Sequence, residues 1–207
     1  MKTKDNYLEE IKEIRKMMEE SSRFLSLSGL SGILVGIYAL AGAFLAYKVL
    51  NSVMFDYDET VATEIVNQLI GIAALTLLLS LATIIWLTRR RVRKAKKKFW
   101  NAGSKLMLVN LAIPIISGGV LIIIFVSRGI YEIVSPACLI FYGLALINAA
   151  KFTRQEIFYM GLFQIGLGLL AALFPAFGLL LWALGFGAIH IIYGAVMYSR
   201  YEHQTKE

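Results

Sequence analysis

Charge is missing from five long stretches of this 207-residue chain. None of Asp, Glu, Lys or Arg occurs in residues 24–47, 65–88, 106–127, 133–150 or 157–199. Only 17% of all residues are charged, whereas 58% are hydrophobic. A soluble domain has about 25% charged and 45–50% apolar residues. The composition therefore excludes a chain that hides its apolar residues in one water-soluble core.

Residues that build disulfides, metal centres and catalytic sites are also scarce. The single cysteine, Cys138, excludes an internal disulfide framework. His190 and His203 are the only histidines, and together with one cysteine they do not make up a zinc site. No GxSxG, HExxH or GxxxxGK motif occurs, and the charge-free runs contain no carboxylate. We therefore predict no enzyme, no metal and no cofactor.

The lengths of the charge-free runs predict six membrane spans. A hydrocarbon core about 30 Å thick requires about 20 helical residues, so the first three runs fit one span each and the run at 133–150 is short but sufficient. The run at 157–199 is about twice as long as one span, and Pro175 and Gly178 mark a turn within it. The predicted spans are about 24–47, 65–88, 106–127, 133–150, 157–173 and 177–198.

The spans are predicted to be helices. Only α-helices and closed barrels satisfy the backbone in lipid, and barrel strands alternate polar with apolar residues. Runs such as GGVLIIIFV (118–126) do not alternate, so the fold class is an all-α integral membrane protein. Ser135 before Pro136 predicts the start of the fourth span, with serine as N-cap and proline at the first helical position.

Lys and Arg are concentrated in alternate connections. Six lie before the first span and nine between the second and third, whereas the connections after the first and third spans have only Lys48 and Arg128. Positive residues gather on the cytoplasmic side. We therefore predict that both termini are cytoplasmic (N-in/C-in), with a transmembrane domain at 24–200 and a cytoplasmic tail at 201–207.

The densest positive charge lies in the segment TRRRVRKAKKKF (88–99). Its place in the largest cytoplasmic connection predicts a role in orienting the flanking helices, with recognition of anionic lipid headgroups as the alternative. Nucleic-acid binding requires a groove-reading motif or spaced aromatics, and only Phe99 and Trp100 follow the run, so we predict no nucleic acid. The candidate headgroup-binding residues are Arg89, Arg90, Arg91, Arg93, Lys94, Lys96, Lys97 and Lys98.

Residues 1–23 are predicted to form a cytoplasmic amphipathic helix. Tyr7, Ile11, Ile14 and Met18 recur at helical spacing and form its apolar stripe. Six cations and six acids make the segment neutral, whereas a helix on a membrane surface usually has a polar face rich in Lys and Arg. The stripe is therefore a candidate partner-binding surface. Packing on the protein's own loops, self-pairing and membrane-surface binding are the alternatives.

Small residues are predicted to bring several spans close together. His190 shares a helix face with Ala183, Gly187 and Gly194, and such a face lets another helix approach closely. His190 is therefore predicted to point into the bundle and to pair with a hydroxyl, amide or carbonyl group. Similar faces are Ser28, Gly32, Gly36, Ala39 and Ala43 in the first span and Gly161, Gly168 and Ala172 in the fifth. For the first span we predict packing within the chain, and a homodimer contact is the alternative.

The third span contains the sequence NLAIPIISGG (110–119). Pro114 has no N–H, so the carbonyl of Asn110 loses its helical partner and a kink is expected. Broken helices of this kind build solute sites in some transporters, although a structural kink is the alternative. The candidate ligand-binding residues are His190, Tyr193, Asn110, Pro114 and Ser117.

Two segments resemble a known group of proteins. IRKMMEESSRFLSLSGLSGI (14–33) and LLLWALGFGAIHIIYGAVMYSRYE (179–202) are similar to a family of uncharacterised six-span bacterial membrane proteins, and the likeness extends over nearly the whole chain. The resemblance implies a bacterial inner-membrane protein. Because no activity is established for that family, it implies no mechanism.

The neutral amphipathic helix and the lack of a catalytic constellation favour a non-catalytic function. We predict a small regulator or accessory subunit that docks a cytoplasmic partner and sits in a bilayer with anionic headgroups. The alternative is a carrier or binder of a small uncharged or lipidic ligand. A cavity lined by both His190 and Asn110 would favour the carrier, and a His190 sealed by packing would disfavour it.

Overall fold

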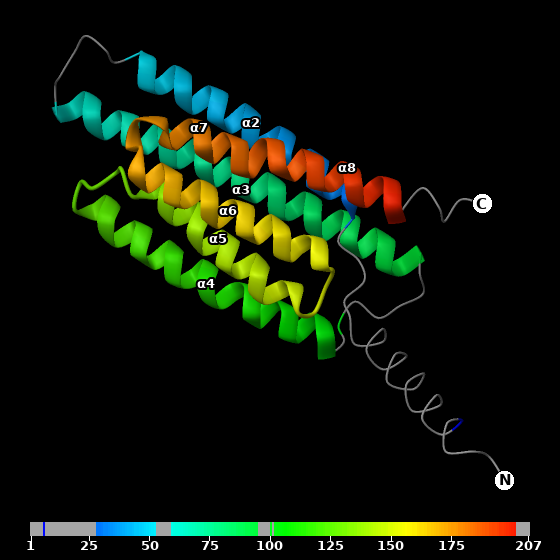
Figure 1. The fold of residues 1–207 in the computed structure, drawn as a ribbon. Coiled ribbons are helices and arrows are strands. Elements are labelled where there is room, and N and C mark those ends of the chain that lie inside the picture. The colour runs from blue at the N-terminus through cyan, green and yellow to red at the C-terminus, as the bar shows by residue number, and fades with distance from the viewer. Residues whose placement is uncertain (1–5, 7–27, 53–58, 95–99, 101, 202–207) are drawn as a thin grey trace.

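The computed structural model describes residues 6, 28–52, 59–94, 100 and 102–201. The predicted apolar stripe at residues 7–18 and the tail from residue 202 lie outside the described residues. Within the described part of the chain every regular element is helical (Figure 1). The elements are α2 (Gly29–Asn51), α3 (Glu59–Lys94), α4 (Ala102–Ser127), α5 (Val134–Ala150), α6 (Gln155–Leu173), the 3₁₀ turn η1 (Pro175–Phe177), α7 (Gly178–Ala183), the π-helical segment η2 (Leu184–Ile189) and α8 (His190–Tyr201).

Five helical segments are long and apolar enough to cross a membrane. The remaining predicted span, the fourth at 133–150, corresponds to α5, which is a shorter apolar helix of 17 residues. Because every regular element of the described residues is a helix, the predicted all-helical class is confirmed. The apolar helices support a membrane-embedded protein. The five long segments are Gly29–Asn51, Thr63–Lys94, Gly103–Ser127, Gln155–Leu173 and Pro175–Arg200, the last running from η1 through α8.

The helices form a bundle with a packed centre and two flanking helices (Figure 1). The centre consists of α2 against α7, η2 and α8, and of α5 against α6 and α7. On the flanks, α3 packs mainly on α2, and α4 packs mainly on α5. Only 6% of the most apolar window of α3, and likewise of α4, is buried inside the protein. Most of the surface of these two helices is therefore apolar and available to lipid.

Helices α2 and α8 approach so closely that only glycine fits between them. A methyl group on Gly194 would lie 2.6 Å from the carbonyl oxygen of Gly29 and 2.6 Å from the backbone nitrogen of Ile33. Gly36 in turn lies against the backbone of Gly187. The predicted close packing is thus confirmed at Gly36, Gly187 and Gly194, which join the first and last spans, and the order of the pairs makes the two helices antiparallel. The prediction that His190 shares this face is wrong, because its side chain bonds Tyr142 on α5 after the wider turn of η2.

A second glycine contact joins α5 to α6. A methyl group on Gly143 or on Gly161 would lie 2.7 Å from the carbonyl oxygen of the other residue. The predicted face of α6 is confirmed at Gly161 and Gly168 but is wrong at Ala172, which is exposed. Its neighbour Ala171 is fully buried, because the face continues three residues after Gly168 rather than four.

The predicted start of the fourth span is wrong by two residues. Helix α5 begins at Val134, and the residue before it, Ile133, makes no side-chain cap. Ser135 and Pro136 therefore lie inside the first turn, where the N–H that proline lacks has no helical partner in any case. The predicted turn at 173–178 is confirmed by η1, which separates α6 from α7.

The close contact at Gly194 generates a stability prediction. Gly194→Ala should lower the free energy of unfolding in detergent micelles by about 1–3 kcal/mol, because the added methyl group forces α2 and α8 apart. Gly71→Ala is the matched control, since no atom lies within 4 Å of a methyl group there. The control should be neutral or should stabilise by up to about 1 kcal/mol. Equal effects of the two variants would contradict the close packing.

Candidate functional site

His190 is buried at the start of α8, with both ring nitrogens bonded inside the protein. Nδ1 lies 3.0 Å from the carbonyl oxygen of Gly185, and Nε2 lies 2.9 Å from the hydroxyl of Tyr142 on α5. A carbonyl oxygen only accepts hydrogen bonds, so Nδ1 carries the proton and donates it. A buried imidazolium without a counter-ion would be costly, so we assign the neutral imidazole to His190, which is 5% exposed. In that form Nε2 accepts from the Tyr142 hydroxyl. The predicted pairing of His190 with a hydroxyl and a carbonyl is confirmed.

The carbonyl of Gly185 also receives a second side chain. The amide nitrogen Nε2 of Gln164 on α6 donates to the same oxygen at 2.9 Å, and Gln164 is fully buried. A methyl group on Gly185 would lie 2.5 Å from Oε1 of Gln164, so the residue must be glycine for the amide to approach. Tyr142, His190, Gly185 and Gln164, called here the core network, thus tie α5, α6, η2 and α8 together.

The core network depends on the π-helical segment η2. A π-helix pairs backbone groups five residues apart rather than four, and such segments often occur at functional sites. The wider turn places His190 beside the carbonyl of Gly185, which is five residues earlier in the chain. Sequence reasoning did not predict η2, and the only local signal is the pair of glycines at 185 and 187.

Aromatic rings enclose the core network. The ring centroids of Phe186 and His190 are 5.8 Å apart and nearly parallel, and those of Tyr142 and Phe186 are 5.0 Å apart. Trp182 extends the row, with its ring centroid 5.0 Å from that of Phe186. Such ring pairs contribute about 0.5–1.5 kcal/mol each beyond the area that they bury. Packing of this kind leaves His190 only 5% exposed.

One polar atom of the core network is left over. Oε1 of Gln164 has no hydrogen-bond partner among the described residues. An unpaired buried acceptor costs about 1–3 kcal/mol. Gln164 is therefore held in place by the bond of its amide nitrogen and by packing.

The structure does not bring the predicted ligand-binding residues together. His190 faces α5, and Tyr193 packs half-buried near Leu146 and Met160. Asn110, Pro114 and Ser117 lie on the flanking helix α4 instead. Asn110, Pro114 and Ser117 also do not face one common cavity. The side chain of Asn110 bonds the carbonyl of Leu106 in its own helix at 2.8 Å, Ser117 is exposed, and α4 continues through Pro114 without a break.

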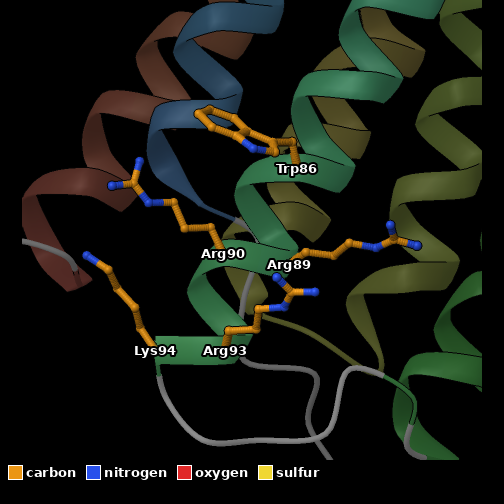
Figure 2. Close-up of a pocket in the computed structure, with 5 residues that line it drawn as sticks. All are labelled: Trp86, Arg89, Arg90, Arg93 and Lys94. Carbon is orange, nitrogen blue, oxygen red and sulfur yellow. The ribbon is translucent and has the colours of Figure 1, made fainter.

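The positively charged end of α3 forms a surface pocket. The pocket is open on one side, has a volume of about 420 Å³ and is lined by five residues of α3, namely Trp86, Arg89, Arg90, Arg93 and Lys94 (Figure 2). The guanidinium carbon of Arg90 lies 5.8 Å from the centre of the Trp86 ring, a cation–π contact. Four of the predicted headgroup-binding residues therefore share one pocket.

Of the other four predicted headgroup-binding residues, the structure describes only Arg91. Arg91 is half-buried and does not line the pocket, while Lys96, Lys97 and Lys98 are outside the described residues. Trp86 was not among the predicted residues. Its place four residues before Arg90 is the sequence signal that was available.

Neither the models of protein families, nor the curated proteins, nor the solved structures contain a match to this chain. Among the described residues, no three of His, Cys, Asp and Glu lie close enough together to hold a metal ion. Two features of the chain's own geometry therefore carry the functional argument: the closed core network and the pocket at the end of α3.

The hydrogen bond between Tyr142 and His190 generates a testable coupling. Tyr142→Phe and His190→Phe each remove this bond while keeping a ring in place. A double-mutant cycle of unfolding free energies should give an interaction of about 0.6–1.7 kcal/mol, which runs from the average to the largest value found between membrane helices. Tyr159→Phe, at an exposed site, is the control and should change stability by less than about 0.5 kcal/mol. Strictly additive effects of Tyr142→Phe and His190→Phe would rule out the bond.

Proposed function

We propose that this chain is a non-catalytic protein that crosses the bacterial inner membrane six times, with both termini in the cytoplasm. The span that is not among the five long segments is α5, the fourth in the chain, whose 17 residues extend about 25 Å. That length approaches the thickness of the hydrocarbon core, about 30 Å. Because α5 packs on α4, α6 and α7, much of its surface meets protein rather than lipid, which relaxes the length that a span requires.

The distribution of charge over the bundle supports this topology. Gly29 at the start of α2 contacts Tyr198 near the end of α8, and Arg200 lies 3.4 Å from Glu156 at the start of α6. The start of α2, the end of α3 and the end of α8 are therefore at one end of the bundle (Figure 1). Nine of the eleven Lys and Arg residues in the described part of the chain lie at that end, as expected for the cytoplasmic side, whereas Lys48 and Arg128 lie at the other end. The nine are Arg89, Arg90, Arg91, Arg93, Lys94, Lys105, Lys151, Arg154 and Arg200.

Labelling in sealed cells tests the topology. In a Cys138→Ser background, Lys97→Cys should react with a membrane-impermeant maleimide only after the cells are opened. Tyr57→Cys, between the first two spans, should react in intact cells. If the cysteine at position 97 is labelled from outside, or the one at position 57 is protected, the proposed orientation is wrong.

The closed surroundings of His190 favour a regulator or accessory subunit over a carrier. His190 is 5% exposed and uses both ring nitrogens within the protein, so neither is open to a ligand. A carrier built on His190 and Asn110 needs the two side chains to share a void, and they have different partners. The surfaces left for function are at the cytoplasmic end. We assign partner docking to the stripe of Tyr7, Ile11, Ile14 and Met18, because this segment is amphipathic and carries no net charge.

Paired substitutions within the N-terminal segment test the partner role. Ile11→Ser/Ile14→Ser should reduce the amount of partner that co-purifies with the chain at least tenfold, because it removes half of the apolar stripe. Lys12→Ser/Glu13→Ser changes as many residues on the polar face and should leave co-purification within twofold of the original. Deletion of residues 1–20 should abolish it. Unchanged co-purification after the deletion would contradict the proposed function.

A further inference from the structure

The cations at the end of α3 fall into two pairs. Arg90 and Lys94 are four residues apart, as are Arg89 and Arg93, so each pair lies along one side of the helix. Figure 2 shows Arg90 and Lys94 extending toward the side of α2 and α8, and Arg89 and Arg93 extending the opposite way. All four line the same pocket. The pocket therefore offers two separate positions for negative charge.

The wall of the pocket continues into an apolar stripe. Trp86 is 61% exposed, and Leu75, Leu79 and Ala82 precede it at helical spacing on the same exposed side of α3. An indole at the junction of charged and apolar surface is typical of the membrane–water interface. Two pairs of cations above a long apolar stripe match a molecule with anionic groups at one end and hydrocarbon chains below them. A small soluble anion would make no use of the stripe.

We propose that the pocket at Trp86 binds a phospholipid whose headgroup carries two phosphates. One phosphate lies with Arg90 and Lys94 and the other with Arg89 and Arg93, while an acyl chain follows Trp86, Leu79 and Leu75. Guanidinium groups suit this role because their N–H donors match phosphate oxygens in pairs. Cationic pockets at the cytoplasmic ends of membrane helices recognise such headgroups. The site does not depend on a protein partner, so it goes beyond the regulatory role.

Lipid retention on the purified full-length chain tests the proposal. The protein is placed in phosphatidylcholine nanodiscs that contain either cardiolipin, with two phosphates, or phosphatidylglycerol, with one, at equal total charge. Native mass spectrometry after extraction measures the lipid that stays bound. Cardiolipin should be retained at least tenfold more than phosphatidylglycerol.

Charge-neutralising double variants locate the site. Arg90→Gln/Lys94→Gln and Arg89→Gln/Arg93→Gln should each weaken cardiolipin retention about 30-fold, since a basic residue near the surface contributes about 1 kcal/mol and 1.4 kcal/mol corresponds to tenfold. Lys105→Gln/Lys151→Gln removes two exposed cations from the same end of the bundle and should change retention by less than twofold. Trp86→Ala leaves every charge in place and should weaken retention several-fold.

Four results would overturn the proposal. An equal loss of cardiolipin retention in the pocket variants and in the Lys105/Lys151 control would show that general surface charge, and not the pocket, retains the lipid. Equal retention of cardiolipin and phosphatidylglycerol would remove the two-phosphate requirement. Displacement of cardiolipin by inorganic phosphate at matched phosphate concentration would indicate a soluble-anion site, and displacement by a polyglutamate peptide would indicate a protein-docking site. None of these results bears on partner co-purification, so the two proposals fail separately.

Discussion

A polar group inside the hydrocarbon of a membrane has to find its partner within the protein, and the carbonyl of Gly185 is where this chain meets that constraint. It accepts hydrogen bonds from both His190 and Gln164, while the Tyr142 hydroxyl occupies the other nitrogen of His190. Three apolar helical segments, namely α5, α6 and the segment formed by η2 and α8, are joined through one backbone atom and its neighbours. The side chains of Gln164 and His190 reach this carbonyl because residue 185 is a glycine and because η2 has a wider turn than an α-helix.

The centre of the bundle and the end that carries the α3 pocket have different physical roles. The centre of the bundle is held by the two glycine contacts, α2 with α8 and α5 with α6, and by the core network. The flanking helices α3 and α4 turn apolar surface toward lipid. The charged and aromatic side chains that another molecule could contact are concentrated at the end of α3, where cations and Trp86 line a pocket. We therefore place function at the membrane surface rather than inside the bundle.

Much of the fold is predictable because charge and glycine have large, local effects in a membrane protein. Charge-free runs locate the helices, and Gly36, Gly187 and Gly194 predict close packing, although the structure alone shows that the first and last spans are the partners. The start of α5 was predicted wrongly at Ser135, since an apolar helix can begin without a side-chain cap. The π-helical segment is beyond sequence reasoning because its extra residue per turn is set by the packing of Tyr142 and Gln164, which are distant in the chain. The Trp86 pocket was predicted only as general positive charge, because the direction of each long side chain is decided by its neighbours.

The state of the His190 ring tests the closed core most directly. His203→Gln leaves His190 as the single histidine, so ¹⁵N solid-state NMR of the labelled chain in lipid bilayers reports on that ring alone. The account predicts a neutral imidazole with the proton on Nδ1 and slow exchange of that proton with deuterated water. A neutral ring with its proton on Nε2 would contradict the hydrogen bond from Nδ1 to Gly185, and rapid exchange with water would show that His190 faces an open cavity; either result would contradict the account.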